Sequence, residues 1–458
     1  MIGMGLSGMA ATRLIKEFGG AAFVSDFQSR DKLADQIKEL ESLGVSYEVD
    51  GHTDALLKTD FVVISPGVTS KSPIVKKLRD AGIPIFSEIE IGSWNLRGML
   101  LGITGSNGKS TTTMMLHNIL MADGQESIPC GNLGAPLCDQ VARLSSRGYA
   151  VAEISSFQLE FIEQFAPSVA AILNISPDHL ERHGSLKTYR EEKLRITENQ
   201  NTHDTLVLNA ESSELDARSI ITHAKKKYFG TLDALDSAAI QEDSRGVFLK
   251  GDSLCATTDG RTHKILETSE LGAPGAHNIE NAMAASSMAL VCGVRPDSIR
   301  KALLEFRGLE HRLESIARVN GVHFVNDSKA TNVGAAITAI GSVTAPIRLI
   351  LGGSSTDDDF KPLAHVVSER VCGVVAIGDA RSEIFDALGR TVGVEFADSM
   401  YEAVEKLFEA ARPGETILLS QACDSLDMFE GFAHRGKCFK DAVSKIAGRF
   451  EGANAIGN

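Results

Sequence analysis

The sequence has little of what marks several classes of protein. Its seven cysteines are scattered and odd in number, and none forms a C-x-x-C pair, which argues against a disulfide framework or a zinc site. No apolar run approaches the roughly 18 residues needed to span a bilayer, and no basic-then-apolar leader opens the chain. We therefore expect a reduced, cytoplasmic protein without a membrane partner.

Positive charge is also scarce. Lysine and arginine number 46 against 60 aspartates and glutamates, which gives a formal net charge of −14. This balance argues against a nucleic-acid partner, so a polyanionic ligand must be bound locally by loop amides, a metal ion and a few lysines. Low-complexity tracts and short repeats are missing as well, and 458 residues with 43% hydrophobic content predict two to four globular domains.

Strand-like and helix-like stretches alternate through three segments, which predicts an α/β protein with three domains. Residues 1–92 are typical of a Rossmann-like domain, with buried strands such as DFVVIS. Residues 93–307 carry a glycine-rich loop, further strands and, near 240–268, short strands joined by Gly and Asp turns, which predicts a P-loop ATPase-like domain. Residues 308–458 contain HFVND, IRLILGG, GVVAIGD and TILLSQ, the pattern of a second Rossmann-like, doubly wound sheet.

The chain opens with MIGMGLSG, in which Gly3, Gly5 and Gly8 fit the G-x-G-x-x-G pattern of a dinucleotide-binding turn. Asp26 follows the strand-like AAFVS at the spacing of a ribose-binding acid. Only two residues precede Gly3, so the strand that such a turn requires is missing. We expect either a truncated first strand or a genuine start upstream, with about five or more additional residues. A βαβ turn that binds no ligand is the plain alternative.

Residues 98–113, GMLLGITGSNGKSTTT, predict a buried strand that runs through a glycine-rich turn into a helix. Such a turn binds phosphate through backbone N–H groups, with Lys109 placed for the outer phosphates and Ser110 for Mg²⁺. The generic P-loop pattern requires a glycine six residues before Lys109. That position is Ile103, and the nearest glycine is Gly102, so the pattern fails by one residue. The sequence therefore predicts a variant loop for a nucleotide triphosphate.

Groups that suit a metal ion or a phosphoryl group lie downstream of this loop. Glu153 ends the strand-like YAVAE, where a Walker-B acid would face the phosphates, although a solvated strand-end carboxylate is the plain alternative. A loop bearing Asp178, His179 and His183 follows the next strand, and the helix after it carries Lys193. Lone histidines are more often surface or core groups than ligands, so these residues alone do not identify the phosphoryl acceptor.

Eight motifs in order along the chain resemble those of the Mur ligases: TGSNGKSTTT, AEISSFQLE, NISPDHLERHGS, YREEKLRI, GAHNIENAMAA, GLEHRLE, NDSKATN and SLDMFEGFAHRG. The SLDMF stretch followed by Arg435-Gly436 is most similar to the branch that adds D-glutamate to UDP-N-acetylmuramoyl-L-alanine in peptidoglycan precursor synthesis. The Asn-Pro-Arg motif expected of the diaminopimelate-adding branch is missing from residues 308–458. Folylpolyglutamate synthase shares only the two later domains.

The resemblance implies a reaction in two steps. The γ-phosphoryl group of ATP passes to the alanine carboxylate, and the amino group of D-glutamate then displaces phosphate from the acyl phosphate. The implied cofactors are ATP and two Mg²⁺ ions, with the metal ligands Ser110, Glu153, His179 and a carbamylated Lys193. Carbamylation turns an ammonium group, which repels metal, into an anionic oxygen ligand. An ordinary ion pair with Glu191 or Glu192 is the plain alternative for Lys193.

Further roles carry over from the family position by position. Catalytic roles fall on Lys109, Glu153, His179, Lys193 and Lys329. Nucleotide contacts fall on Gly105, Asn107, Gly108, Lys109, Ser110, Thr111, Asn278, Asn281, Arg312 and Asp327. Sugar-nucleotide contacts fall on Gly5, Leu6, Ser7, Asp26, Ser65, Pro66, Gly67 and Asn132, and glutamate contacts on Thr331, Ser425, Leu426 and Phe432. Because these groups come from three segments, we expect a monomer whose third domain closes on the second during the reaction.

One departure from the family pattern concerns the amino-acid substrate. Where the glutamate-adding branch has a lysine after a strand-end Gly-Gly pair, LILGGSSTDDDFKPL places Thr356, and Lys361 is the nearest cation. Loss of a charge-assisted bond worth about 1.5–3 kcal/mol predicts a glutamate KM raised roughly ten- to a hundredfold unless another group compensates. Two alternatives stay open: a related ligase that adds another amino acid or acts on folate, and a non-catalytic or oxidoreductase Rossmann protein that binds NAD at GMGLSG.

Overall fold

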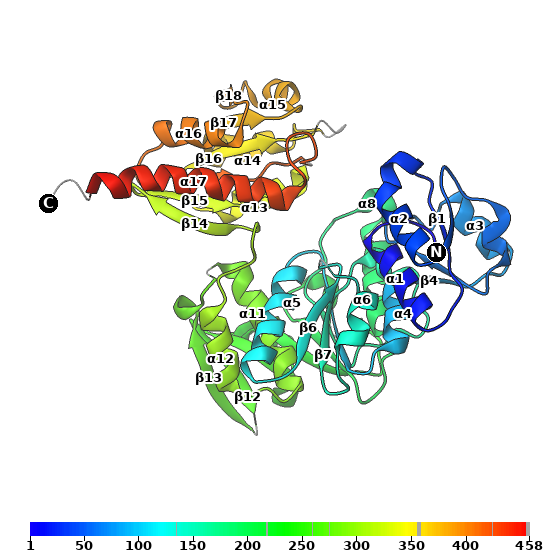
Figure 1. Cartoon of the computed structure of the whole chain (residues 1–458). Coiled ribbons are helices and arrows are strands. Elements are labelled where there is room, and N and C mark those ends of the chain that lie inside the picture. Colours follow the sequence, from blue (N-terminus) through cyan, green and yellow to red (C-terminus); the bar gives the residue numbers. More distant parts are fainter. Residues whose placement is uncertain are drawn as a thin grey trace. The chain divides into compact units, whose positions relative to one another are not determined.

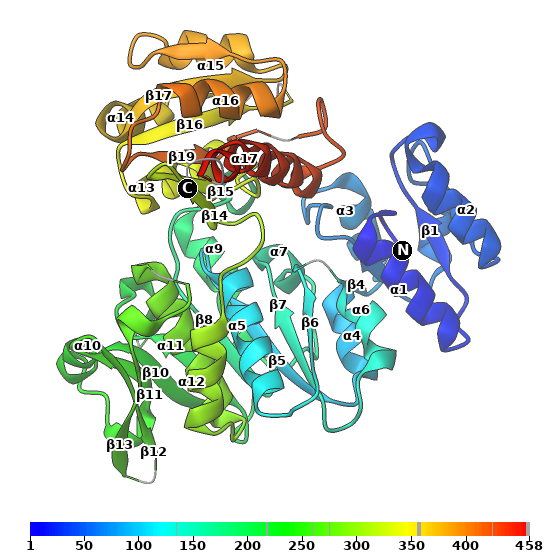
Figure 2. The ribbon, with the colours of Figure 1, turned by 60° about the vertical axis from the view of Figure 1, so that its left-hand side comes forward.

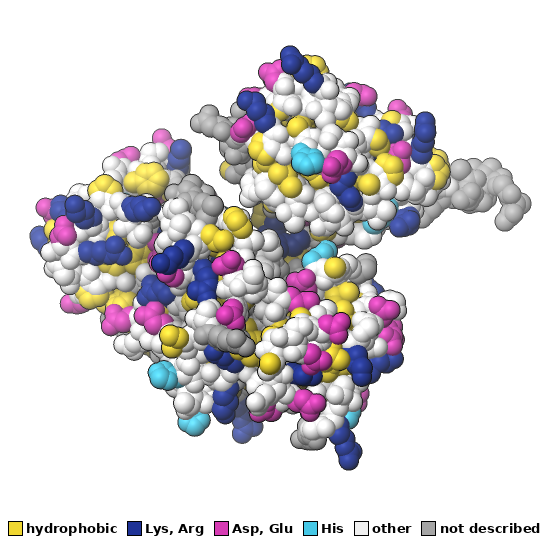
Figure 3. All heavy atoms as spheres, turned by 180° about the vertical axis from the view of Figure 1, so that it is seen from behind, with side chains coloured by type: hydrophobic (Ala, Val, Ile, Leu, Met, Phe, Trp, Pro, Cys, Tyr) yellow, Lys and Arg dark blue, Asp and Glu magenta, His cyan; other side chains and the backbone are white. Residues whose placement is uncertain are grey.

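The computed structural model describes residues 1–454 apart from positions 134, 217–218, 259, 274, 355–358 and 424. Two compact units follow each other along the chain, Met1–Phe306 (unit 1) and Arg307–Asn458 (unit 2) (Figure 1). In the described part of the chain, no helix is long and apolar enough to cross a membrane. On the face drawn in Figure 3, basic and acidic side chains are interspersed and hydrophobic ones are scattered.

The first 95 residues of unit 1 alternate short strands with helices. Their elements are α1 (Leu6–Glu17), β1 (Phe23–Ser25), α2 (Ala34–Ser42), β2 (Ser46–Glu48), β3 (Val62–Ile64), α3 (Pro73–Asp80), β4 (Ile85–Ser87) and α4 (Glu88–Asn95). β1 pairs with β2 and β3 with β4, both in parallel. Ile2 forms parallel one-residue bridges to Ser25 and Ile64, so it joins the two pairs. The glycine-rich turn therefore follows a strand that is reduced to one residue, Ile2.

A nine-stranded sheet lies at the centre of the rest of unit 1, in the order β13-β12-β11-β10-β9-β8-β5-β7-β6. Its strands are β5 (Met99–Thr104), β6 (Ser127–Gly131), β7 (Tyr149–Glu153), β8 (Val169–Ile172), β9 (Thr205–Asn209), β10 (Lys225–Thr231), β11 (Arg245–Lys250), β12 (Ser253–Thr258) and β13 (Arg261–Glu267). The pairs from β6 across to β11 are parallel, whereas β12 and β13 add an antiparallel meander at the edge. This meander confirms the short strands that the sequence predicted near 240–268.

Helices of unit 1 cover this sheet. They are α5 (Lys109–Ala122), α6 (Leu137–Gln140), α7 (Ser156–Leu159), α8 (Leu180–His183), α9 (Leu186–Leu194), α10 (Leu232–Ser237), α11 (Ala276–Val291) and α12 (Pro296–Glu305). α5 packs against α11 and α12, and Figure 2 shows the three side by side along the sheet. The apolar run of β5 is buried as a parallel strand covered by helices should be, so the predicted strand and helix around the glycine-rich loop are confirmed.

β5 marks the point where the order of the strands reverses. The chain goes from β5 to β6 and β7 on one side of it, and then to β8 and β9 on the other. Ligands of open α/β sheets bind outside the carboxyl ends of the strands at such a point. The loop that follows β5 therefore starts where this topology favours a ligand site.

Unit 2 is a doubly wound sheet in the order β14-β15-β19-β16-β17-β18, parallel except for β14. Its elements are β14 (Glu314–Val319), β15 (Val322–Asn326), α13 (Val333–Ser342), β16 (Ile347–Gly352), α14 (Leu363–Arg370), β17 (Val371–Ile377), α15 (Arg381–Leu388), β18 (Val394–Phe396), α16 (Met400–Ala410), β19 (Thr416–Leu419) and α17 (Phe432–Asn454). One hydrophobic core lies under α13, α14 and α15, and another under α16 and α17. The predicted fold class is confirmed, whereas the domain boundaries at 92/93 and 307/308 stay predictions.

Candidate active site

The predicted phosphate loop joins the carboxyl end of β5 to the amino end of α5. Gly105 and Gly108 have φ values of +154° and +84°, which favour glycine. A Cβ on Gly108 would lie 2.2 Å from Oδ1 of Asn281, so the close approach of α11 also requires glycine there. Ser110 and Thr111 are buried in the first turn of α5. The start of this helix thus has the arrangement of N–H groups and hydroxyls that binds phosphate.

Asparagine side chains brace this loop. The N–H of Asn107 donates to Oδ1 of Asn174 over 2.8 Å, and Nδ2 of Asn174 donates to the carbonyl of Asn107 over 3.2 Å. Thr112 Oγ1 donates to Oδ1 of Asn281 over 3.2 Å, and Nδ2 of Asn281 donates to Oδ1 of Asn278 over 3.4 Å. Asn278 and Asn281 of α11, which are predicted to contact the nucleotide, therefore lie next to the loop and helix that follow β5.

Two predicted catalytic lysines meet at one carbonyl of the loop. Lys109 Nζ donates to the carbonyls of Gly105 (2.9 Å) and Ser106 (2.7 Å), and Lys193 Nζ donates to the same Gly105 carbonyl over 2.9 Å. Lys193 is only 1% exposed, and its Nζ lies 4.5 Å from the centre of the Tyr189 ring. Burial, reinforced by the charge of Lys109, lowers the pKa of Lys193 to about 6. At neutral pH its side chain is therefore mostly an uncharged amine.

Glu153 ends β7 and is 3% exposed. Its Oε1 accepts a hydrogen bond from Asn132 Nδ2 over 2.8 Å, and its carbonyl accepts the N–H of Asn132 over 2.8 Å. Its Oε2 is buried and has no hydrogen-bond partner in the described part of the chain. A buried carboxylate oxygen without a partner on the protein fits a hard cation such as Mg²⁺. Glu153 is therefore held by Asn132, which is predicted to contact the sugar nucleotide, and its geometry suits the predicted metal role.

The two histidines that follow β8 have different environments. His183 is buried, and its Nε2 lies 3.0 Å from Ser156 Oγ, as expected of a core histidine whose pKa burial lowers. The side chain of His179 is 45% exposed and lies 3.5 Å from the carboxylate of Asp178. Its ring packs on Phe157 with 5.0 Å between ring centres, and its φ of +51° is unusual for a residue other than glycine. Of the two, His179 fits the predicted ligand role.

The first predicted sugar-nucleotide turn leads into α1. Gly5 precedes this helix, and Leu6 in its first turn is 74% exposed, with Ser7 next to it partly exposed. The Asp26 carboxylate is 5% exposed and accepts the N–H groups of Met4 (2.7 Å) and Gln28 (2.9 Å). Asp26 therefore braces the glycine-rich turn, and a contact to substrate stays a prediction.

The second predicted turn, Ser65-Pro66-Gly67, follows β3 and touches the first. Ser65 Oγ donates to the carbonyl of Gly3 over 3.3 Å, and a Cβ on Gly3 would lie 2.6 Å from this oxygen. The carbonyl of Pro66 accepts a hydrogen bond from Arg182 over 2.8 Å. The structure thus brings the two turns together and links the second one to the loop that follows β8.

In unit 2, the carboxyl end of β15 braces a strained turn. Arg312 lies between His311 and Leu313, whose φ values are +63° and +43°. Asp327 Oδ1 accepts the N–H of Leu313 over 3.1 Å, and its Oδ2 accepts a bond from Ser420 Oγ over 3.0 Å. Burial raises the pKa of Asp327 to about 7. The two predicted nucleotide contacts of this unit, Arg312 and Asp327, are therefore joined through one turn.

The remaining predicted contacts of unit 2 lie on the loops around β15 and β19. Lys329 Nζ is 5.7 Å from the ring centre of Phe432, the first residue of α17. Ser425 is buried, Leu426 is 67% exposed, and Thr331 is partly exposed. Lys329 and Phe432 are thus brought together, as their predicted roles require, whereas Thr356 lies outside the described residues.

The sequence quoted Arg435 only as a family marker, yet it is 0% exposed in the structure. Its Nε donates to Ser328 Oγ (2.9 Å), its Nη2 to the carbonyl of Ser328 (2.7 Å), and its Nη1 to the carbonyl of Cys423 (3.1 Å). The guanidinium therefore ties the start of α17 to the loops that follow β15 and β19.

Sequence reasoning missed two other residues. Arg182 bonds to the second turn at Pro66 and Val68 and to Glu160, through partners that are distant in the sequence and so leave no local pattern. Gln421 is 0% exposed, and neither atom of its side-chain amide has a hydrogen-bond partner among the residues that the structure describes. It precedes Ala422, whose φ is +59° and whose N–H donates to the carbonyl of Ala330 over 3.2 Å. No sequence signal distinguishes a buried glutamine from an exposed one.

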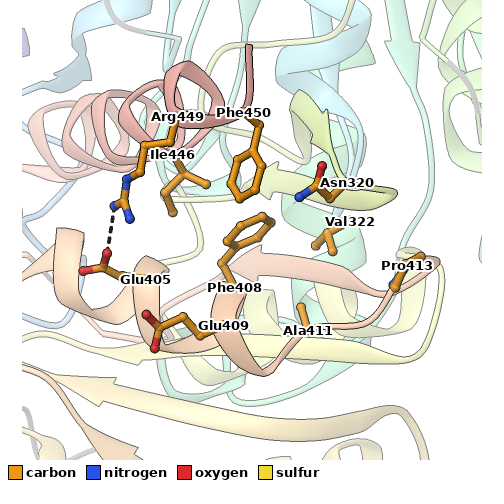
Figure 4. A pocket seen from close by; sticks show the side chains of 10 residues that line it. All are labelled: Asn320, Val322, Glu405, Phe408, Glu409, Ala411, Pro413, Ile446, Arg449 and Phe450. Carbon is orange, nitrogen blue, oxygen red and sulfur yellow. Dashed lines mark hydrogen bonds and ion pairs between the residues drawn. The ribbon is translucent and has the colours of Figure 1, made fainter. Parts of the chain in front are cut away.

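A hollow of about 390 Å³ in unit 2 lies away from these residues (Figure 4). Phe408 and Phe450 face each other across it, next to Val322 and Pro413. Val322 opens β15 and Pro413 precedes β19, so the hollow is at the amino ends of these parallel strands. Asp327 follows the carboxyl end of β15, so the hollow is not part of the candidate site.

Fold and loop together define a nucleotide-binding α/β enzyme, and comparison with known proteins identifies the family. The model of the MurD-like N-terminal domain of Mur ligases matches residues 1–87, the Mur ligase middle domain matches 103–289, and the Mur ligase glutamate ligase domain matches 311–423. The chain belongs to the Mur ligase family.

Relatives and solved structures agree with this assignment. The UDP-N-acetylmuramoylalanine–D-glutamate ligase of Acidobacterium capsulatum is 39% identical over 458 residues, which cover 99% of this chain and 98% of the relative. The enzyme of the same name from Koribacter versatilis is 38% identical and covers 98% and 97%. The crystal structure of UDP-N-acetylmuramate-alanine ligase MurC from Thermotoga maritima superposes with a TM-score of 0.58 at 20% identity, covering 97% and 98%, which shows the shared fold.

Proposed function

We propose that this chain ligates D-glutamate to UDP-N-acetylmuramoyl-L-alanine with the hydrolysis of ATP to ADP and phosphate, in peptidoglycan precursor synthesis. The main support for this function is the match to ligases of that activity, at 36–39% identity over nearly the whole chain. The glycine-rich loop at the strand-order reversal of unit 1 supplies the nucleotide site that the reaction requires.

The first chemical step is phosphoryl transfer from ATP to the carboxylate of the nucleotide substrate. The amino end of α5 and Lys109 bind the triphosphate, with Ser110 in the first turn. Ser110, Glu153, His179 and a carbamylated Lys193 hold Mg²⁺ in this proposal. Mg²⁺, when bound, supplies positive charge between the triphosphate and the acceptor carboxylate. The orphan Oε2 of Glu153 supports this ligand set.

Carbamylation of Lys193 requires its amine in the neutral form. The nitrogen lone pair attacks CO₂, a C–N bond forms, and the nitrogen loses one proton, which leaves an anionic carbamate. The lowered pKa of Lys193, about 6, provides the neutral amine at physiological pH. An ordinary exposed lysine would be almost fully protonated there.

The second step is attack by the amino group of D-glutamate on the acyl phosphate. In this proposal Thr331, Ser425, Leu426 and Phe432 of unit 2 bind glutamate, Arg312 and Asp327 contact the nucleotide, and Lys329 assists the transfer. We assign residues 1–92 to the sugar nucleotide, 93–307 to ATP and 308–458 to the amino acid.

Release of phosphate tests the function directly. The purified chain is incubated with ATP, Mg²⁺ and UDP-N-acetylmuramoyl-L-alanine, together with either D-glutamate or L-glutamate, and the product is identified by mass. We expect phosphate release and a product heavier by one glutamyl residue with D-glutamate alone. A product with L-glutamate and none with D-glutamate, or no product with either, would overturn the proposal.

A further inference from the structure

One arginine joins the two loops of unit 1 that carry the predicted sugar-nucleotide and metal contacts. Arg182 belongs to α8, in the loop that follows β8, whereas the turn at 65–68 follows β3. Its Nη1 donates to the carbonyl of Pro66 over 2.8 Å and its Nη2 to the carbonyl of Val68 over 3.2 Å. Lys71 Nζ donates to the carbonyl of Arg182 over 3.0 Å, so the two segments are bonded in both directions.

The other edge of the same guanidinium is fixed to the middle segment of unit 1. Arg182 Nε donates to Oε1 of Glu160 over 2.9 Å, and its Nη2 donates to Oε2 over 3.1 Å. The side chains of Arg182 and Glu160 are only 13% and 7% exposed. A bidentate pair with so little exposure is screened weakly by water and holds the guanidinium plane in one orientation.

Phe157 connects this guanidinium to the predicted metal ligand. The guanidinium carbon of Arg182 lies 4.0 Å from the centre of the Phe157 ring, within cation–π distance. The rings of His179 and His183 pack against the same phenylalanine, with 5.0 Å and 5.5 Å between ring centres. A shift of Arg182 would therefore move the surface on which His179 rests.

Only arginine can make this set of contacts. A guanidinium offers five N–H donors in a rigid plane, and Arg182 directs four bonds from it to one carboxylate and two carbonyls. A lysine carries its donors on one nitrogen atom and cannot reach these acceptors together.

We infer that Arg182 is a positioning residue for the ligation. It holds the 65–68 turn, and with it the nucleotide substrate, at a fixed place relative to the loop of His179. This inference rests on the proposed function. Its consequence is that binding of the nucleotide substrate and use of Mg²⁺ depend on the same side chain, although neither ligand is predicted to touch it.

Arg182→Lys tests the inference, with Arg13→Lys as the matched control. Arg13 on α1 also makes a bidentate pair with a carboxylate of the middle segment, Asp139 of α6, at 3.0 Å and 2.8 Å. It contacts neither the 65–68 turn nor the loop of His179 in any bond of the described residues. The two arginines therefore share their chemistry and differ in the loops they hold.

For Arg182→Lys we expect the KM for UDP-N-acetylmuramoyl-L-alanine and the Mg²⁺ concentration for half-maximal rate to rise together, each by about tenfold, while the KM for D-glutamate stays within about twofold. Arg13→Lys should leave all three values within about twofold. Glu160→Gln keeps the bonds to the turn and frees the charge of Arg182, so it should shift the same two values in the same direction by a smaller factor.

Equal effects of Arg182→Lys and Arg13→Lys, or unchanged constants in Arg182→Lys, would overturn the inference. If Arg182→Lys does not fold, Glu160→Gln decides alone, and unchanged constants in that variant overturn the inference. An inactive wild-type chain with these substrates is a different result, because it contradicts the proposed function rather than the role of Arg182.

Discussion

Among the described residues, each unit has one lysine or arginine that is almost completely buried, and the two differ in charge and in hydrogen bonding. Lys193 in unit 1 is 1% exposed, donates one bond to the carbonyl of Gly105, and has its pKa lowered to about 6. Arg435 in unit 2 is 0% exposed and donates hydrogen bonds to Ser328 and Cys423. A lysine can lose its proton on burial, whereas a guanidinium stays charged and must be given acceptors.

This difference in charge indicates the role for which each buried basic residue is suited. A buried neutral amine has a nucleophilic lone pair, so Lys193 is suited to covalent modification. A buried guanidinium with oriented acceptors is a rigid connector, so Arg435 is suited to fixing loops. Burial of a basic residue therefore indicates opposite roles in the two units. Variants at these two positions test the contrast.

The largest effect is expected for Lys193→Ala. Loss of the carbamate should lower kcat by about a thousandfold or more, roughly 4 kcal/mol of barrier. Added formate or acetate should restore part of the rate, because a small carboxylate can supply the missing oxygens. Steady-state phosphate release measures both. Lys187→Ala, which removes an exposed lysine from the same helix, is the control and should keep wild-type rates. Full activity of Lys193→Ala without rescue would contradict the carbamate.

Arg435→Lys should destabilise unit 2 by about 2–4 kcal/mol, because the ammonium cannot serve all three acceptors and is costly to bury. Urea unfolding followed by a probe in unit 2 measures this loss. Arg449→Lys, on the same helix but half exposed and paired with Glu405, should cost less than about 1 kcal/mol. Equal losses for the two variants would show that Arg435 is no connector.

Thr356→Lys should lower the KM for D-glutamate by roughly ten- to a hundredfold while kcat changes little, because the new bond to the substrate carboxylate forms equally in ground and transition states. Initial rates over a range of D-glutamate concentrations measure this change. Lys361→Ala is the companion variant and should leave KM unchanged. The reverse outcome, a tenfold rise for Lys361→Ala and no change for Thr356→Lys, would place the carboxylate at Lys361.

The smallest effect is expected for Gln421→Met. Replacing a buried amide that has no hydrogen-bond partner among the described residues with an apolar side chain of similar length should raise the free energy of unfolding by about 1–2 kcal/mol. Gln241→Met, at an exposed position, should change it by less than about 0.5 kcal/mol. A weaker affinity for D-glutamate instead would assign the amide of Gln421 to substrate binding.

Local patterns predicted the elements that hold the site, but not the contacts between them. The strand before Gly105, the helix after it and the position of Glu153 at a strand end all follow from apolar periodicity and turn residues, and the structure confirms them. The burial of Lys193 and the link from Arg182 to Pro66 depend on segments about a hundred residues apart, which no local pattern encodes. The central strand expected before Gly3 could not be predicted from two residues, and in the structure it is represented by the two bridges of Ile2.

Backbone strain in the loops of both units has a consequence for stability. His179, itself a predicted metal ligand, adopts a positive φ, and so do His311 and Leu313, which flank Arg312, and Ala422, which follows Gln421. Such conformations cost about 1–3 kcal/mol each in residues other than glycine, so glycine at these positions would relieve much of that cost. The same glycines would widen the range of loop conformations and so blur the placement of the groups beside them. Engineering for thermal tolerance and engineering for turnover therefore pull in opposite directions at these four residues, and a search for heat-resistant variants should leave them unchanged.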